Sequence, residues 1–212
     1  MGKLLKQLFI ALGQALWYRL THLFGHRPAP AIVPDGQPLR LDLGCGTNKK
    51  EGFLGCDQHQ FPGVDVVMNL TTRWPWKDNA VDEAHMSHAL EHFTGPQRVQ
   101  IFNELHRVMK PGAIATIITP YWCSNRAYGD FTHAWPPVSE ALYLYVSKTW
   151  RKVQAPDNDI EWNPAGYNCD FDSEIRYELH PLIKAGDDNA RNMAITFYKE
   201  ACQDMVVRLT KK

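Results

Sequence analysis

Gly44 and Gly46 stand directly after an alternating apolar run at positions 39–43, which also contains an acidic residue, Asp42. The alternation predicts a buried strand, and two glycines without β-carbons allow a ligand to lie against the backbone where that strand ends. A dinucleotide-binding turn would place a third glycine where this chain has Lys49, which argues against a pyrophosphate site. An ordinary glycine pair in a strand-to-loop turn is the alternative interpretation.

A second carboxylate, Asp57, ends the next apolar run at positions 53–57. In a sheet of parallel strands, an acid at the tip of the second strand can accept hydrogen bonds from the two vicinal hydroxyls of a ribose. We therefore expect Asp57 to bind a ribose, with a solvated loop aspartate as the alternative.

A histidine-rich segment follows the apolar run at 80–87, and it permits a different chemistry. His88, Glu91 and His92 spell H-x-x-E-H, the pattern of inverted zinc peptidases, in which two imidazoles hold the metal and the glutamate is the general base. The pattern follows a strand instead of lying within a long helix, and no third ligand is evident apart from Glu104. We expect no metal site, and a zinc metallohydrolase remains the alternative.

The order of apolar segments indicates the fold class. Strand-like runs at 64–68 and 80–87 precede a helix that begins at Thr94-Gly95-Pro96, is stopped by Lys110-Pro111-Gly112, and leads into an apolar strand at 113–120. Strands and helices alternating in this way predict an α/β doubly wound sheet with helices on both faces. Further along, we expect a strand at 174–180, a helix at 190–202 and a final strand at 204–210.

Two longer motifs give these segments a family resemblance. Residues 82–92 fit D-x-x-x-x-S-H-x-L-E-H, and residues 104–112 are similar to E-x-x-R-V-L-K-P-G-G. Together with the glycine turn, they resemble a small-molecule subgroup of the class I S-adenosylmethionine-dependent methyltransferases. The resemblance implies a seven-stranded, mostly parallel sheet with an antiparallel last strand in one domain over 35–212. Two departures are Asn69, where many relatives have aspartate, and Ala113, which replaces a glycine.

The same resemblance implies S-adenosylmethionine as the cofactor and assigns residues to it. Its methionine end would lie over the first glycine turn, its ribose would bind the acid of the second strand, and its adenine and sulfonium would border the following loop and the histidine segment. The expected cofactor-binding residues are Asp42, Gly44, Cys45, Gly46, Asp57, Asn69, Leu70 and His88.

The aromatic and polar segment at 120–137 is the expected acceptor lid. It contains Asp130 and His133 in a stretch that resembles the subgroup's D-P-T-H, which implies His133 as a general base assisted by Asp130, with His92 as the second choice. A structural hydrogen bond within the loop is the alternative. The expected acceptor is a small molecule or a glycan hydroxyl, and a non-catalytic S-adenosylmethionine-binding protein is a further alternative.

The composition limits the classes of molecule that the chain is expected to bind. The chain has 212 residues, with 23 basic and 23 acidic side chains, and so lacks the basic surplus typical of nucleic-acid-binding proteins. Its five cysteines form no Cys-x-x-Cys pair, which favours a reducing compartment and a cytoplasmic location.

The first 34 residues differ from the rest. Basic residues stand among apolar ones at helical spacing, no acid occurs before Asp35, and Pro28, Pro30 and Pro34 indicate a linker. Polar interruptions argue against a signal peptide or a transmembrane helix. We expect a basic amphipathic helix, which either packs on protein or contacts a membrane surface peripherally through residues 1–27.

Overall fold

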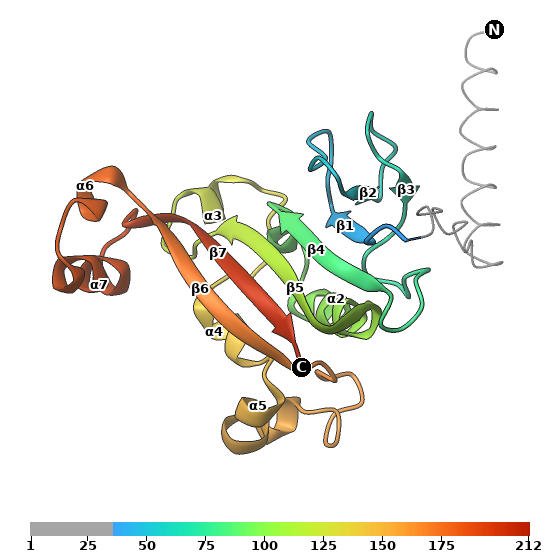
Figure 1. Ribbon diagram of the computed structural model, residues 1–212. Helices are drawn as coiled ribbons and strands as arrows, with labels where there is room; N and C mark the ends of the chain where they lie inside the picture. The colour runs from blue at the N-terminus through green and yellow to red at the C-terminus, as the bar shows by residue number, and fades with distance from the viewer. Residues whose placement is uncertain (1–35) are drawn as a thin grey trace, which may run out of the picture. The chain divides into compact units, whose positions relative to one another are not determined.

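The computed structural model describes residues 36–212 and contains one seven-stranded sheet (Figure 1). The strand order is β3-β2-β1-β4-β5-β7-β6; the first five strands pair in parallel, and β7 is antiparallel to both of its neighbours. The strands are β1 (Arg40–Leu43), β2 (Leu54–Asp57), β3 (Val66–Val67), β4 (Val81–Ser87), β5 (Met109–Pro120), β6 (Phe171–Leu179) and β7 (Cys202–Lys211). The predicted doubly wound, mostly parallel sheet with an antiparallel last strand is confirmed.

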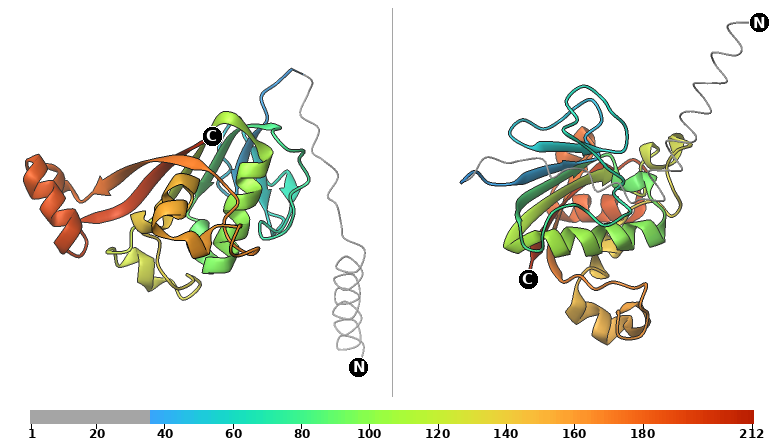
Figure 2. Two further views of the ribbon diagram at one scale, coloured as in Figure 1. Left: turned by 90° about the horizontal axis from the view of Figure 1, so that it is seen from below. Right: turned by 90° about the vertical axis from the view of Figure 1, so that its right-hand side faces the viewer.

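The helices are unevenly distributed along the described chain. Within residues 36–212, the connections β1–β2, β2–β3 and β3–β4 contain no helix, and the sheet instead packs against α2 and later helices, with α2 and α5 on the same side of it (Figure 2). The helical segments are η1 (Leu90–His92), α2 (Gly95–Val108), α3 (Arg126–Gly129), α4 (Glu140–Leu144), α5 (Lys148–Gln154), η2 (Pro156–Asn158), α6 (Pro181–Lys184) and α7 (Asp188–Phe197).

The helix α2 begins where the sequence predicts. Thr94 and Gln97 form a capping box, which satisfies backbone N–H groups that the first turn leaves without helical partners. Its buried apolar side chains join the core with those of β4 and β5. The main contributors are Ile101, Phe102, Leu105 and Val108 from the helix and Ala84, Met86, Ala115 and Ile117 from the strands.

The predicted stop of this helix needs a correction. The helix ends at Val108 and β5 begins at the next residue, so Lys110, Pro111 and Gly112 belong to the strand. Val81 pairs with Met109 and Glu83 pairs with Ile114, so the residues between them bulge out of the ladder. A bulge admits a proline that a regular central ladder would exclude.

Arg107 holds the loop between β3 and β4. Its guanidinium donates to both carboxylate oxygens of Glu104, to Asp78 and to the backbone carbonyls of Trp74 and Trp76, at 2.6–3.0 Å. Trp74 and Trp76 are thereby fixed with their rings buried at 2% and 6% exposure. These hydrogen bonds fix the position of the loop, which contains no helix.

The chain closes with a long hairpin that extends from the sheet. The strands β6 and β7 pair from Phe171–Lys211 to Leu179–Cys202, and α6 and α7 lie at the tip (Figures 1 and 2). The helix predicted at 190–202 spans Asp188–Phe197 instead, because β7 takes up the chain from Cys202.

The predictions for residues 1–34 lie outside the described residues. Among residues 36–212, no helix combines the length and the apolar character that crossing a membrane requires.

Candidate active site

A cleft of about 540 Å³ opens at the carboxyl ends of β1, β2 and β4. This is where sheets of parallel strands bind ligands, because the strand order reverses there and leaves a crevice. Of the predicted cofactor residues, six line the cleft: Gly44, Gly46, Asp57, Asn69, Leu70 and His88. The cleft is also lined by Gln58, His59, Phe61, Ala89, His92, Phe93 and Thr132.

Gly44 and Gly46 form one wall of the cleft, and both have backbone conformations that favour glycine. Their φ angles are +71° and +52°. A β-carbon on Gly44 would lie 2.5 Å from the β-carbon of Ala89, whereas one on Gly46 would meet no atom within 4 Å. The turn therefore packs tightly against the η1 segment at Gly44 and faces open space at Gly46.

Asp57 ties this turn to the tip of β2. One carboxylate oxygen accepts from the backbone N–H of Gly46 and the other from the backbone N–H of His59, both at 2.9 Å. The residue is 9% exposed. Because each carboxylate oxygen can accept a second hydrogen bond, acceptor capacity remains toward the cleft.

Asp42 and Cys45 lie behind the wall and do not line the cleft. Asp42 is buried, accepts from the backbone N–H of Lys50 at 2.7 Å and lies 2.8 Å from Nδ1 of His85. Cys45 packs beside Gly55, and burial raises the pKa of its thiol to about 11. Asp42 thus stabilises the glycine loop from the side away from the cleft, through its hydrogen bond with Lys50.

Asn69 and Leu70 form the cleft wall that follows β3. The side-chain oxygen of Asn69 accepts from the backbone N–H and the hydroxyl of Thr71, both at 2.8 Å. Leu70 is buried, and its carbonyl accepts from the indole of Trp74 at 3.0 Å. Asn69 is therefore a turn-forming residue as well as a lining one.

His88 directly follows β4 and has a left-handed conformation, with φ of +52°. Its Nδ1 lies 3.4 Å from a carboxylate oxygen of the buried Glu91, and its Nε2 lies 3.9 Å from Asp204. The hydrogen bond with Glu91 raises the pKa of His88. Among residues 36–212, the second carboxylate oxygen of Glu91 has no hydrogen-bond partner.

His92 lines the cleft and meets His133, which does not line it, with ring centroids 4.9 Å apart. The hydroxyl of Thr132 lies 3.0 Å from Nδ1 of His92 and 2.7 Å from a carboxylate oxygen of Asp130, and hydrogen bonds from Thr132 lower the pKa of Asp130. His133 donates from Nδ1 to the carbonyl of Ala127 at 3.2 Å, and its Nε2 lies 3.8 Å from Asp130. The predicted acid–base residues are therefore brought together by the fold.

The helical geometry required for a zinc-peptidase site is not formed. His88 follows the last residue of β4, and residues 90–92 make a single 3-10 turn, so His88 and His92 do not share a helix face. Glu91, His92 and His133 do place one ligating atom each within 4.8 Å of one another. Within the described residues, these three form a group whose ligand atoms lie close enough together to bind a cation.

Arg98 fastens the lid and was missed by sequence reasoning. The residue is 2% exposed, and its guanidinium donates to the backbone carbonyls of Leu90 and Pro136, at 3.3 and 2.8 Å, and at 3.4–3.5 Å to those of Ala134 and Glu91. Burial lowers the pKa of this guanidinium. The available signal was a basic residue on the apolar face of a helix, one turn before Ile101 and Phe102.

Comparison with known proteins supports a methyltransferase domain. Residues 50–117 match the family described as a methyltransferase domain. The chain is 29% identical over 141 residues to an uncharacterized methyltransferase of Synechocystis, covering 58% of this chain and 63% of that protein. It is 25% identical over 146 residues to the 2-phytyl-1,4-naphtoquinone methyltransferase of Nostoc, covering 64% and 62%. The chain thus spans just under two thirds of the length of each.

One solved structure shares the fold across nearly the whole chain. It is a SAM-dependent methyltransferase from Archaeoglobus fulgidus, with a TM-score of 0.56, 18% identity, and coverage of 93% of this chain and 94% of that one. This likeness extends the fold assignment well beyond the residues that the family match covers.

Proposed function

We propose that the protein is an S-adenosylmethionine-dependent methyltransferase that acts on a small molecule or a glycan hydroxyl. The strongest support is the cleft itself, in which a glycine wall and the carboxylate of Asp57 meet at the tips of parallel strands. The match of residues 50–117 to a methyltransferase domain includes β2, β3 and β4, which form much of this cleft. The name of the Nostoc relative supports a small-molecule acceptor.

The cleft residues suit the parts of the cofactor in the following way. The backbone of Gly44, Cys45 and Gly46 would receive the methionine end, since no side chain projects from either glycine. Asp57 would accept from the two ribose hydroxyls with the lone pairs that Gly46 and His59 leave free. Asp42 would act indirectly, by holding the loop in place.

Three further residues complete the cofactor site. Asn69 and Leu70 would border the adenine, because they follow β3 beside Asp57. His88 would lie near the sulfonium at the tip of β4. The bound cofactor supplies an electrophilic methyl group, and the protein aligns an acceptor with it and excludes water.

His133, Asp130 and His92 are suited to receive the acceptor's proton. The Nδ1 of His133 is the donor to the carbonyl of Ala127, so in the neutral ring Nε2 keeps its lone pair and can take a proton. Asp130, 3.8 Å away, would stabilise the resulting imidazolium. His92 is held by Thr132, which also binds Asp130, and would orient or replace His133 in this role.

Calorimetry with S-adenosylhomocysteine tests the cofactor site. Asp57→Ala is expected to weaken binding at least about tenfold, because two ribose hydroxyls and two loop N–H groups lose their acceptor. Asp65→Ala is the matched control, since Asp65 also accepts a backbone N–H, from Gly55 at 2.7 Å, but does not line the cleft. Equal losses in both variants, or no binding by the unaltered protein, would contradict the assignment.

Turnover is tested separately by following methyl release from S-adenosylmethionine over a library of small-molecule and glycan acceptors. His133→Ala is expected to abolish most turnover while leaving binding of S-adenosylhomocysteine intact. Binding without turnover on any acceptor would favour the non-catalytic alternative.

A further inference from the structure

A second hollow, of about 390 Å³, lies apart from the cofactor cleft. Its walls come from two distant parts of the chain: the segment after β5, with Trp122, Cys123 and Tyr128, and the end of α7, with Phe197 and Tyr198. The hollow is in the size range of pockets that hold small organic ligands. None of its lining residues belongs to the cofactor cleft.

The lining is aromatic and unusually exposed. Trp122, Tyr128, Phe197 and Tyr198 are 40%, 51%, 73% and 54% exposed, although large aromatic side chains gain most from burial. Such side chains gathered around a concavity mark a binding surface, whereas single exposed apolar residues do not. A flat apolar ring, stacked between rings from the two walls, would bury this surface.

The charge at the hollow has one sign. Among the residues that line it in the described chain, Lys199 is charged and none is acidic. An ammonium group at the edge of an aromatic pocket favours a ligand that has an acidic group beside its apolar body. The charge of Lys199 therefore distinguishes an acidic ligand from a neutral one of the same shape.

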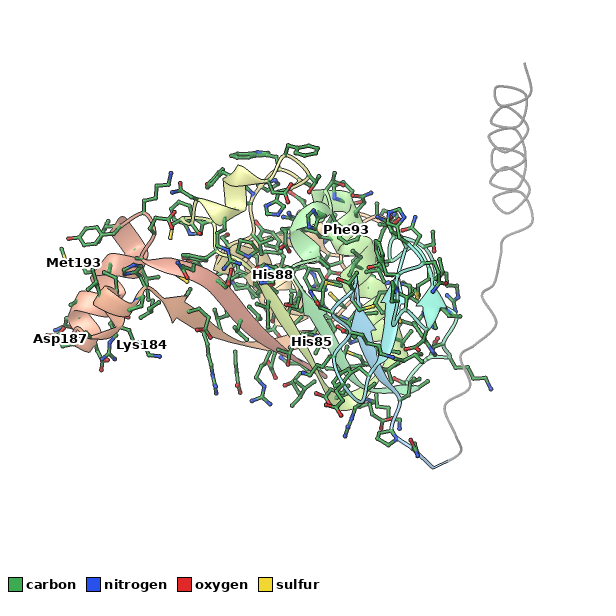
Figure 3. All side chains as sticks on the ribbon, turned by 90° about the horizontal axis from the view of Figure 1, so that it is seen from above. His85, His88, Phe93, Lys184, Asp187 and Met193 are labelled. Atoms are coloured by element: carbon green, nitrogen blue, oxygen red, sulfur yellow. The ribbon has the colours of Figure 1, made fainter. Side chains whose placement is uncertain are left out.

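A chain of polar contacts leads from α3, whose Tyr128 lines the hollow, to the cofactor cleft. Arg126, at the start of α3, binds Asp204 at 2.6 Å, and Asp204 lies 3.9 Å from Nε2 of His88, which lines the cleft. On the other side, Glu200 accepts from the backbone N–H of Asn125. In Figure 1, α3 lies between α7 and the end of β4, and Figure 3 labels Met193 on α7 and His88 beside the cleft.

We propose that this hollow binds the apolar body of an amphiphilic, acidic acceptor, whose acidic group pairs with Lys199. The proposal rests on the proposed function, since it names the class of molecule that would be methylated. The acceptor's reactive end would extend past α3 toward the cofactor cleft, and its other end would stay in the hollow.

Titration of the full chain with 2-naphthoate tests the hollow directly. Octanoate provides an arm with an alkyl body, and 2-naphthalenemethanol provides a neutral ring of similar shape. We expect binding of 2-naphthoate, octanoate or both, and weaker binding of the alcohol. Preference between the first two distinguishes a ring body from a hydrocarbon tail.

Variants assign the binding to the two walls. Phe197→Ala and Tyr128→Ala, one in each wall, are each expected to weaken naphthoate binding about tenfold. Leu182→Ala is the control, because Leu182 is an 80% exposed apolar residue on the same hairpin tip that does not line the hollow. Lys199→Gln is expected to weaken the binding of 2-naphthoate but not that of 2-naphthalenemethanol. Lys184→Gln, which removes a lysine outside the hollow, is its control and should change neither.

The outcomes separate this inference from the proposed function. Binding of S-adenosylhomocysteine together with no binding of either acid, or with acid binding that Phe197→Ala and Tyr128→Ala leave unchanged, would overturn the inference alone. Failure to bind S-adenosylhomocysteine would overturn the proposed function. A dimer in sedimentation experiments that Phe197→Asp dissociates would assign the hollow to a second copy of the chain, and would also overturn the inference.

Discussion

Gly44 and Gly46 lie in the same wall of the cleft, but an added methyl group meets different surroundings at the two positions. Gly46→Ala is expected to cost about 1–2 kcal/mol of folding free energy, from its left-handed conformation alone. Gly44→Ala is expected to cost clearly more, because its β-carbon would collide with Ala89. Urea unfolding of both variants measures the difference, and equal losses would contradict the packing described here.

The Gly46→Ala methyl group would project into the cleft. Its expected signature is therefore a folded protein with weakened binding of S-adenosylhomocysteine, measured by calorimetry at a temperature where both proteins are folded. Unchanged affinity would show that the cofactor does not approach this glycine.

His106 provides a pH test of the fold. Its ring lies against Phe171, Nε2 is buried without a partner among the described residues, and burial together with nearby Lys211 lowers its pKa to about 4. An unfolded histidine has a pKa near 6.5, so acidification favours the unfolded chain, which binds the proton more readily. The stabilising contribution is complete above about pH 6.5 and is lost as the pH falls toward 4.

His106→Gln is expected to remove about 2 kcal/mol of the stability that the unaltered protein loses between pH 7 and pH 4. The free energy of unfolding in urea, measured across this range, reports the slope. His59→Gln, at an exposed position, should retain the original slope. An unchanged slope in His106→Gln would show that folding does not lower the pKa of His106.

At the scale of single residues, the sequence predicted which residues line the cleft better than it predicted which side chains hydrogen-bond with one another there. The glycine turn, Asp57, Asn69 and His88 all line the cleft, because spacing along strands determines which edge of a sheet they reach. The partner of Asp42 could not be predicted, since His85 lies on another strand and meets it through the parallel register. Pairings of this kind depend on three-dimensional packing, which a sequence pattern does not specify.

Among the elements, the attachment of the lid to η1 depends on one buried cation. Arg98→Met would leave the carbonyls of Leu90, Glu91, Ala134 and Pro136 without this donor. We expect a loss of about 3–5 kcal/mol, as for other broken buried charge networks. Amide hydrogen exchange should rise at residues 130–137, while Arg176→Met, at an exposed position on β6, should change neither quantity. Unaltered exchange in the lid would contradict this role.

The strands and α2 were predictable because each has a clear period or cap. The Thr94-Gly95-Pro96 start gave the beginning of α2 correctly, since capping is a local property. Its end was predicted less well, because Lys110-Pro111-Gly112 is as compatible with a bulged strand as with a helix stop. The absence of a helix from the β3–β4 connection had no local signal, because its fixation by Arg107 joins residues about thirty positions apart.

Across the whole molecule, the thiols report how tightly the fold excludes reagents. All five cysteines are free and buried, and burial raises the pKa of Cys169 and Cys202 to about 12. Since the thiolate is the reactive form, the folded protein should react slowly with a disulfide reagent at pH 8, and all five thiols should react in urea. A fast-reacting thiol in the folded protein would contradict this burial.

The tip of the long β6–β7 hairpin is a part of the molecule that can differ between related proteins while the sheet stays the same. The residues between Leu179 and Cys202 form an excursion whose base is closed by the pairing of the two strands, and it contacts the segment after β5 through Glu200 and the walls of the hollow. Its length and composition can therefore vary without altering the order of the sheet or the glycine-walled cleft. Related chains could change what they recognise by exchanging this tip alone, leaving the machinery that transfers the methyl group untouched.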